Sequence, residues 1–561
     1  MATGADALCR ALADRGVRHV FGLPGSQSVD LWDALRRARE PRAVCAAHEL
    51  SASFMAIGYA RVTGRPAVLA TIPGPGFTYA LTGLAEALLD SVPLVHVTVG
   101  PAVRGDGGPA LQAIRQGEIA APLVKGVLEV ESAEQIDDAI GEAFELAAAG
   151  EPGPVLVQVP EPALGQSAGR RRTASRPSRP VVSATDIGAA VARIAAAERP
   201  VFLCGAGAAG AADALRTVVE TLRAPVLTTT SGRGVLPESH PLSLPFDSPG
   251  ASPAVVNELL ESADLVVVVG AKLSHNGSHG FALRLPADRL IRVDTSHDLG
   301  AGPYGGGTHV AADAAEFIAR LAAGALRPCW RPDEVSTWRD RFVAAAQVAG
   351  PEVGGWSAAE LFAAMRAELA DDAVVTTDSG LHQYLVRRHL TVLAPRTLLI
   401  PADLQSMGFG IPAALGAGVA TGKRTVAVVG DGGFAISGLE LATAVHEGLP
   451  ITVVVLVDRA FGLIRAQQRR RTGAEYGVDL PAIDLQRAAA AVGADYHLVV
   501  DGNGSEVFAD ALGATGVHVV EVPVGAPGGA GARDLAVRSA RSLLGGPTFN
   551  RLGTAAKRRS S

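Results

Sequence analysis

The fold is decided by residues 424–462, which read RTVAVVGDGGFAISGLELATAVHEGLPITVVVLVDRAFG. Residues 425–429 and 451–457 are apolar, β-branched runs of the kind found in buried strands. Between them, the glycine-rich stretch 430–433 predicts a tight turn, and the spacing of Ser437 and Glu440 predicts a capping box that opens a helix. A strand–helix–strand crossover of this length is right-handed, so the two strands are predicted to run parallel in one sheet.

Asp431 and Asp458 directly follow these two predicted strands. Parallel strands end at the same edge of a sheet, so neighbouring strands would bring the two carboxylates close together. Carboxylates beside glycine-rich backbone can hold a hard divalent cation, and the cation then binds a diphosphate that the carboxylates alone would repel. The spacing alone also fits a helix-capping Asp431 and an unrelated Asp458 at a strand end, so it leaves both interpretations open.

The same alternation of strands and helices recurs outward along all 561 residues. It predicts an α/β protein with three doubly wound parallel-sheet domains, a number that suits the chain length. The predicted units are an N-terminal domain at 1–164, a linker at 165–182, a central domain at 183–326, a linker at 327–355, a C-terminal domain at 356–525 and a tail at 526–561.

The composition narrows the class of protein. Hydrophobic residues make up 48% and charged residues 19%, with a formal net charge of −6, which favours a compact protein without nucleic-acid partners. The arginine run within 165–182 is expected to be a solvated connector. Because no apolar run approaches the roughly 20 residues of a membrane span and no secretory signal is visible, we expect a cytoplasmic protein without membrane association. The four dispersed cysteines show no zinc or disulfide pattern.

Several motifs, taken in chain order, resemble those of the acetolactate synthase family of thiamine-diphosphate enzymes, which are 2-oxo acid decarboxylases and carboligases. They are Ala-Ala-His-Glu at 46–49, Gln-Ser-Met-Gly-Phe-Gly-Ile-Pro at 405–412, and Gly-Asp-Gly at 430–432 followed by Asp458. The resemblance covers about residues 5–525. It implies a pyrimidine-binding N-terminal domain, a central domain and a diphosphate-binding C-terminal domain, with thiamine diphosphate and Mg²⁺ as cofactors.

The resemblance also implies catalytic roles. Glu49 would hydrogen-bond N1′ of the aminopyrimidine ring, which lowers the pKa of the 4′-amino group so that it can act as a base. Read without the family, Glu49 fits better a first-turn helix carboxylate that interacts with the helix dipole. Met407 would be the apolar wedge that bends the cofactor, a task that suits a long thioether. Gln112 would lie above the thiazolium ring and orient a carbonyl group or water.

The family pattern further implies a set of contacts to the cofactor and metal. The metal ligands would be Asp431, Asp458 and the backbone carbonyl of Ala460. The other cofactor contacts would come from Gly25, Pro73, Gly74, His382, Gln405, Gly430, Gly432, Gly433 and Phe461.

The acceptor pocket departs from that of ordinary acetolactate synthases. Gln467 replaces a tryptophan associated with acceptor choice, and Asn276 replaces an arginine that helps to hold a substrate carboxylate. Ser26 is shared with benzoylformate decarboxylase-like members, in which the serine contacts substrate, and His275 or His279 would be a proton donor near the site. A carboligase is favoured, and a decarboxylase that does not ligate is the alternative.

Two further questions concern cofactor and assembly. Residues 205–210 read Gly-Ala-Gly-Ala-Ala-Gly, a formal dinucleotide motif, but the next predicted strand ends in threonines at 228–230 instead of an acid. An NAD-dependent dehydrogenase is therefore a remote alternative, and the sequence leaves open whether this domain holds FAD. The resemblance implies small 2-oxo acid substrates and a homodimer or homotetramer with active sites between subunits. A non-enzymatic relative would be expected to have lost Glu49 or Asp431.

Overall fold

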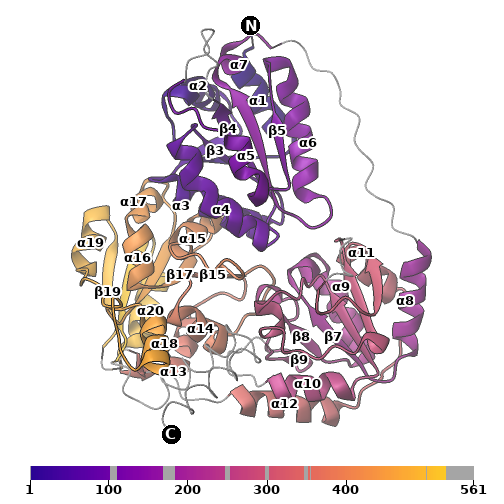
Figure 1. Ribbon diagram of the computed structural model, residues 1–561. Helices are drawn as coiled ribbons and strands as arrows, with labels where there is room; N and C mark the ends of the chain where they lie inside the picture. The colour runs from indigo at the N-terminus through magenta and orange to yellow at the C-terminus, as the bar shows by residue number, and fades with distance from the viewer. Residues whose placement is uncertain are drawn as a thin grey trace.

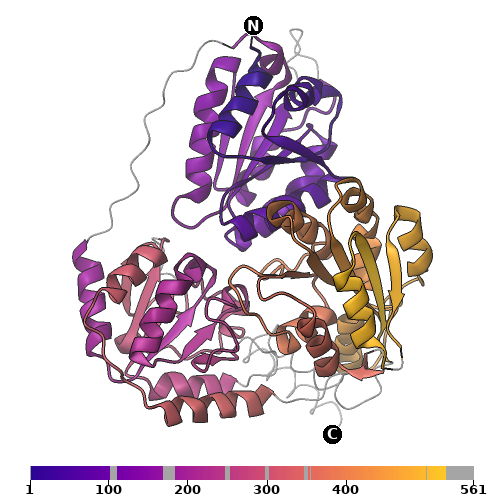
Figure 2. The same cartoon turned by 180° about the vertical axis from the view of Figure 1, so that it is seen from behind.

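The computed structural model describes residues 2–100, 110–168, 184–246, 253–296, 302–346, 352–353, 355–500 and 502–525. Three α/β blocks are arranged around a common centre, and each contains a parallel six-stranded sheet (Figures 1 and 2). This confirms the predicted fold class. Most of the predicted linker at 165–182 and all of the predicted tail at 526–561 lie outside the described residues.

The N-terminal block has the strand order β2-β1-β3-β4-β6-β5. Alternate residues of strand β3 lie on opposite faces of this sheet. Val68 and Ala70 pack in one core cluster, and Ala67 and Leu69 pack in another. Both faces are therefore covered, as a parallel sheet requires. Its strands are β1 (His19–Gly22), β2 (Arg42–Cys45), β3 (Ala67–Thr71), β4 (Leu94–Gly100), β5 (Gly126–Glu129) and β6 (Pro154–Pro160). Its helices are α1 (Gly4–Asp14), η1 (Ser26–Ser28), α2 (Val29–Arg37), α3 (Glu49–Thr63), α4 (Pro75–Leu89), α5 (Gln116–Ala120), η2 (Ala121–Leu123), η3 (Ala133–Gln135), α6 (Ile136–Ala148) and α7 (Glu161–Gly165).

The C-terminal block repeats this topology, with the order β16-β15-β17-β18-β20-β19. Its strands are β15 (Val374–Thr377), β16 (Leu398–Leu399), β17 (Thr425–Gly430), β18 (Ile451–Val457), β19 (Asp495–Leu498) and β20 (Val517–Pro523), preceded by the hairpin of β13 (Glu352–Val353) and β14 (Trp356–Ser357). Its helices are α13 (Ala358–Ala367), α14 (Leu381–His389), α15 (Gly410–Thr421), α16 (Asp431–Ser437), η8 (Gly438–Glu440), α17 (Leu441–His446), α18 (Gly462–Thr472), α19 (Leu485–Val492) and α20 (Gly504–Gly513).

The N-terminal and C-terminal blocks dock through α3 and α15. One core cluster runs continuously across this contact, from Phe54 of α3 to Phe409 beside α15, whose ring centroids are 5.3 Å apart. Because the two blocks share one apolar core, a fixed arrangement of these blocks is favoured.

The central block has the strand order β12-β11-β10-β7-β8-β9, the arrangement of dinucleotide-binding folds. Its strands are β7 (Pro200–Cys204), β8 (Val226–Thr228), β9 (Ser243–Leu244), β10 (Leu265–Val269), β11 (Leu290–Asp294) and β12 (Thr308–Ala311). Its helices are α8 (Ala184–Ala196), η4 (Ala206–Ala211), α9 (Ala212–Leu222), η5 (Thr230–Gly232), α10 (Pro253–Ser262), η6 (Asn276–Ser278), η7 (Ala287–Arg289), α11 (Ala314–Ala322) and α12 (Pro332–Ala346).

Two local expectations differ from the structure. The stretch 327–355, expected to be a linker, contains α12, because Trp330, Val335 and Phe342 provide apolar side chains that bury in the central core. The helix expected to open at Ser437 begins instead at Asp431, whose carboxylate accepts the N–H of the next residue, so the glycines continue into a helical turn. No helix within the described ranges has both the length and the apolarity needed to span a membrane.

Candidate active site

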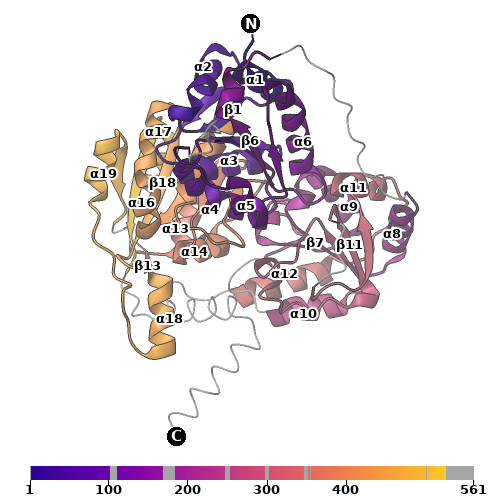
Figure 3. The same ribbon diagram turned by 45° about the horizontal axis from the view of Figure 1, so that its top comes forward.

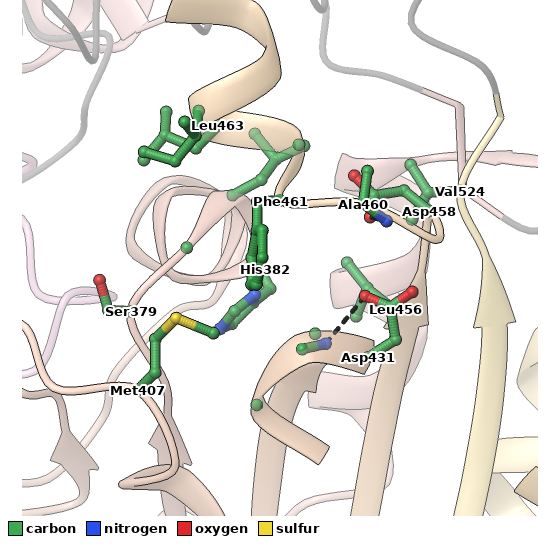
Figure 4. Close-up of a pocket in the computed structure, with 17 residues that line it drawn as sticks. Ser379, His382, Met407, Asp431, Leu456, Asp458, Ala460, Phe461, Leu463 and Val524 are labelled. Carbon is green, nitrogen blue, oxygen red and sulfur yellow. Dashed lines mark hydrogen bonds between the residues drawn. The ribbon is translucent and has the colours of Figure 1, made fainter. Parts of the chain in front are cut away.

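A pocket opens at the carboxyl ends of β15, β17 and β18 (Figure 4). Strand order in this sheet reverses between β15 and β17, and doubly wound folds bind ligands at such a point. Among the predicted site residues, the pocket is lined by His382, Met407, Gly430, Asp431, Gly432, Gly433, Asp458, Ala460 and Phe461. Lining residues that the sequence did not single out are Ser379, Gly380, Leu381, Leu456, Gly462, Leu463, Ile464 and Val524.

Asp431 and Asp458 lie at the ends of adjacent strands, because Gly430 of β17 pairs with Leu456 of β18. Asp431 accepts backbone hydrogen bonds from Gly432 at 2.9 Å and from Arg459 at 2.7 Å. Burial raises the pKa of Asp431, and burial together with the negative charge of Asp431 raises the pKa of Asp458 to about 6. Two carboxylates that disfavour each other's ionisation would be stabilised by a shared cation.

The donor set suits a hard divalent cation. The described residues contain no cluster of three His, Cys, Asp or Glu side chains, so a cation here would take its remaining ligands from backbone carbonyls, water or phosphate oxygens. Mg²⁺ typically binds in this way, through one or two carboxylates and the phosphates of its partner. Glycine at position 462 leaves space beside Asp458, since a Cβ there would lie 2.1 Å from Oδ2 of this carboxylate.

His382 provides a polar group that has no partner within the described protein. It is 7% exposed, and its Nε2 is buried without a hydrogen bond. Burial lowers the pKa of His382 to about 4, so the ring is neutral near pH 7 and carries a single N–H. The ring packs against the glycine turn, because a Cβ on Gly430 would lie 3.1 Å from its Nδ1. In the tautomer that has its N–H on Nε2, this orphaned nitrogen would donate to an anion beside the start of α16.

Met407 projects into the pocket from the loop that precedes α15 (Figure 4). Its methyl group lies 3.2 Å from the position that a Cβ on Gly432 would occupy. Gln405 lies in the same loop with φ of 63° and donates to the carbonyls of Pro401 and Ala402 at 2.8 and 2.6 Å. Its Oε1 accepts the hydroxyl of Ser379, one of the lining residues.

Asp378 is a residue that sequence reasoning missed. It is fully buried and accepts the N–H groups of Gly408 at 3.1 Å and Gly410 at 2.6 Å, which fixes the loop that carries Met407. Burial raises its pKa to about 6, while these backbone hydrogen bonds oppose the rise. Asp378 directly follows β15, as Asp431 directly follows β17. This repetition in the sequence could have identified Asp378 as a candidate site residue.

Glu49 lies in a second cluster, at the carboxyl ends of the N-terminal strands. It is the first residue of α3, and a Cβ on Gly76 would lie 2.9 Å from its Oε1. Glycine at position 76, which the sequence analysis did not single out, therefore leaves room beside this carboxylate. Glu49 is half-buried.

The other predicted N-terminal residues surround this cluster. A Cβ on Gly74 would lie 2.8 Å from Cβ of Gln112, and both residues have positive φ. Gly25 packs on Ile72, next to Pro73 in the turn after β3. Gln27, which was not predicted, donates to Oε1 of Gln112 at 2.7 Å. The structure thus brings Gly25, Gly74 and Gln112 to one edge of the N-terminal sheet.

The predicted substrate residues are not at the described pocket. Gln467 lies further along α18, which projects from the body of the protein (Figure 3), whereas the start of that helix lines the pocket. Ser26 is exposed in η1. His275 belongs to the central block, where its ring packs edge-on against Phe281 with centroids 5.8 Å apart. Any substrate role for them depends on groups beyond this pocket.

Three family models match the chain in the order of its blocks. The N-terminal TPP binding domain of thiamine pyrophosphate enzymes matches residues 2–119, their central domain matches 187–321 and their C-terminal TPP binding domain matches 378–522. Thiamine pyrophosphate is another name for thiamine diphosphate. The chain thus has the three domains of a thiamine pyrophosphate enzyme.

Known relatives narrow the class further. The chain is 32% identical over 476 residues to the acetolactate synthase isozyme 1 large subunit of Escherichia coli, covering 83% of each chain. It is 32% identical over 489 residues to an acetolactate synthase of Mycobacterium bovis, covering 83% of this chain and 78% of that one. It is 33% identical over 482 residues to a probable 2-ketoarginine decarboxylase of Pseudomonas aeruginosa, covering 82% and 83%. The chain belongs to the acetolactate synthase family of thiamine pyrophosphate enzymes.

Proposed function

We propose that this protein decarboxylates a 2-oxo acid with thiamine diphosphate and transfers the acyl carbanion to a second carbonyl compound. The observation that carries the proposal is the pocket that unites the Asp431–Asp458 pair, the orphaned His382 and Met407. Similarity to acetolactate synthases supports ligation. The alternative is decarboxylation without ligation, supported by the decarboxylase relative and by Gln467 in place of the tryptophan of ordinary synthases.

We assign the residues as follows. Asp431, Asp458 and the carbonyl of Ala460 would hold Mg²⁺, His382 and the glycines at 430–433 would hold the diphosphate, and Met407 would support the bend between the rings. Bound thiamine diphosphate would supply an electron sink for the bond pair that stays on the former carbonyl carbon when the carboxylate group leaves as CO₂. Glu49 would hold a proton at N1′ of the aminopyrimidine, and Gln112 would orient the substrate carbonyl.

We propose further that the site forms between two copies of the chain. Within the described residues of one chain, all pocket-lining groups belong to the C-terminal block, while Glu49, Gly74 and Gln112 cluster in the N-terminal block. Large apolar side chains are exposed on α16 and η8, which follow the Asp431 turn: Ile436 is 50% exposed and Leu439 is 70% exposed. A homodimer, or a tetramer built from such dimers, would cover them and exclude water from the reacting carbanion.

Mixing two inactive variants tests this arrangement. Glu49→Gln and Asp431→Asn subunits, unfolded and refolded together, would form hybrid dimers in which one of the two sites has both residues intact. Random pairing then restores about a quarter of the wild-type activity. If both residues of a site came from the same chain, the mixture would stay inactive.

A second cavity supports a proposal for FAD in a structural role. It lies where the strand order of the central sheet reverses, between β7 and β10, and its lining includes Thr229, Lys272 and Asp294. The glycines of the 205–210 motif already have a packing role, since a Cβ on Gly205 would lie 2.2 Å from the carbonyl oxygen of Gly270. Flavin absorbance in the purified protein, released on denaturation, would support FAD, and its absence after reconstitution would reject it.

Product analysis tests the proposed function itself. The protein is incubated with Mg²⁺, thiamine diphosphate and a panel of 2-oxo acids, and products are identified by mass. An acyloin or acetohydroxy acid identifies ligation, and a free aldehyde identifies simple decarboxylation. Dinucleotide reduction without thiamine diphosphate would instead support the remote dehydrogenase alternative.

A further inference from the structure

The loop at 400–407, which carries Gln405 and Met407, is held by a buried charged cluster on the N-terminal block of the same chain. Arg61 of α3 donates to the carbonyl of Ile400 at 2.5 Å. Asp90, just after α4, accepts the N–H groups of Ala402 at 3.0 Å and Asp403 at 3.1 Å. The position of the proposed cofactor-bending residue therefore depends on side chains outside its own block.

Glu86 completes this contact, but its carboxyl group is in an unfavourable place for a charge. The residue is 0% exposed, its Oε2 accepts the N–H of Ser406 at 3.3 Å, and its Oε1 is buried with no hydrogen-bond partner among the described residues. Burial, and next the negative charge of Asp90 one turn further along, raise the pKa of Glu86 to about 8. An acid in this environment is stable in its neutral form near pH 7.

Asp90 has room for one more donor. An ionised carboxylate offers about four lone-pair sites. Arg61 and the N–H groups of Ala402 and Asp403 use three of those on Asp90. The proton of a neutral Glu86 would take the fourth and would leave neither carboxyl group of the pair unsatisfied.

We propose that Glu86 is a positioning residue that works as a neutral acid: its proton, shared with Asp90, fixes the 400–407 loop and so keeps Met407 in place for the cofactor. This inference rests on the proposed thiamine-diphosphate function. Loss of the proton would place two negative charges in one buried cluster with the single cation of Arg61. The 400–407 loop would then no longer be held in one position. Cofactor affinity would then weaken as pH rises.

The groups around Glu86 are consistent with this assignment. Asp90 at the end of its own helix disfavours the ionisation of Glu86, and Arg61 on α3 opposes this effect. On the loop, burial and the negative charge of Asp90 raise the pKa of Asp403. The charges of Lys272 and His275 from the central block lower the pKa of Asp403 and so oppose the effect of its burial. Other titratable groups packed on α4 lie at its first turns, and they include Glu49 against Gly76, His96 of β4 against Phe77 and His48 against Tyr79. Strands β3 and β6 and the short helix η2, which also pack on α4, have no titratable side chain.

The test compares wild type with Glu86→Gln, which keeps the shape of the side chain and a donor but cannot ionise. Calorimetry measures the Kd of thiamine diphosphate with saturating Mg²⁺ at about pH 7 and about pH 9. If only the neutral form is competent, Kd of the wild type rises about tenfold more than that of Glu86→Gln over this interval. The matched control is Glu142→Gln, which changes an exposed glutamate on α6. The Kd of this variant should change with pH as that of the wild type does.

A second readout does not depend on the cofactor. Without thiamine diphosphate, we compare the unfolding equilibrium constants of wild type and Glu86→Gln. As pH rises from about 4.5 to about 8, the constant of the wild type should increase relative to that of the variant by up to about tenfold per pH unit, because the folded state retains a proton that the unfolded state loses. Parallel pH dependences of the two proteins in this readout would overturn the inference and leave the proposed function intact. Wild type that follows the predicted unfolding shift but binds no thiamine diphosphate at any pH would overturn the proposed function instead.

Discussion

Gly416 of α15 lies directly on the backbone of Met55 of α3, so closely that a Cβ at position 416 would be 1.9 Å from the Met55 carbonyl oxygen. Gly58 of α3 makes the reciprocal contact, with a Cβ that would be 2.2 Å from the carbonyl oxygen of Ala413. Two glycines thus allow the helices to cross at short range and join the N-terminal and C-terminal blocks.

Gly416→Ala is therefore expected to destabilise the protein. The added methyl group meets backbone, which cannot rotate away, and overpacking of this kind costs about 1–3 kcal/mol. Chemical denaturation measures the loss. Gly188→Ala is the matched control, because Gly188 lies exposed in helix α8 with no atom within 4 Å of its added Cβ, and alanine there should leave stability unchanged or raise it. Equal losses in both variants would contradict the account of the block contact.

Gly76→Ala is expected to impair activity more than stability. A Cβ at position 76 would lie 2.9 Å from Oε1 of Glu49 and would displace that carboxylate. Since proton transfers by a positioned side chain contribute about 10²–10⁴-fold to a rate, kcat should fall by at least about tenfold. Gly83→Ala on the same helix is the comparison, because its Cβ would meet Ser53 instead. If Gly83→Ala lowers kcat as strongly as Gly76→Ala while the two variants are equally stable, the loss of activity does not act through Glu49.

Acid should unfold the protein partly through His96. This histidine is fully buried in β4, and burial lowers its pKa from 6.5 to about 3. The unfolded chain binds a proton that the folded chain does not, so stability present above about pH 6.5 is lost as pH falls toward about 3, by up to about 1.4 kcal/mol per pH unit. Denaturation as a function of pH should show a weaker acid dependence for His96→Gln. Exposed His446 provides the control variant, His446→Gln, which should follow the wild type.

Much of the C-terminal half of the site could be predicted from sequence. Strand ends and glycine turns follow local patterns, and parallel topology then places Asp431 beside Asp458. The family resemblance added His382 and Met407. Whether these residues perform the proposed roles stays a prediction, as do the exact domain limits.

Residues whose environment comes from distant segments escaped prediction. Asp378 looks like any acid after a strand until the loop at Gly408 folds over it, and Glu86 looks like a surface helix residue until α4 is covered by the C-terminal block. The start of α16 was also missed, because glycine has low helix propensity and only the Asp431 contact favours a turn there. The placement of Gln467, Ser26 and His275 away from the pocket likewise depends on tertiary packing.

Asp431→Asn should weaken cofactor binding without unfolding the protein. The amide keeps the shape and one acceptor but removes the charge that pairs with Mg²⁺, and we expect affinity for thiamine diphosphate to fall by at least about 100-fold. Asp288→Asn, at a side chain 80% exposed in the central block, should leave the affinity unchanged.

Titration of the wild-type protein with thiamine diphosphate in saturating Mg²⁺, followed by calorimetry, addresses the central claim most directly. We predict saturable binding with one site per chain, lost when Mg²⁺ is removed by a chelator and lost in Asp431→Asn. Absence of any heat of binding, or an affinity that neither the chelator nor the substitution changes, would contradict the account.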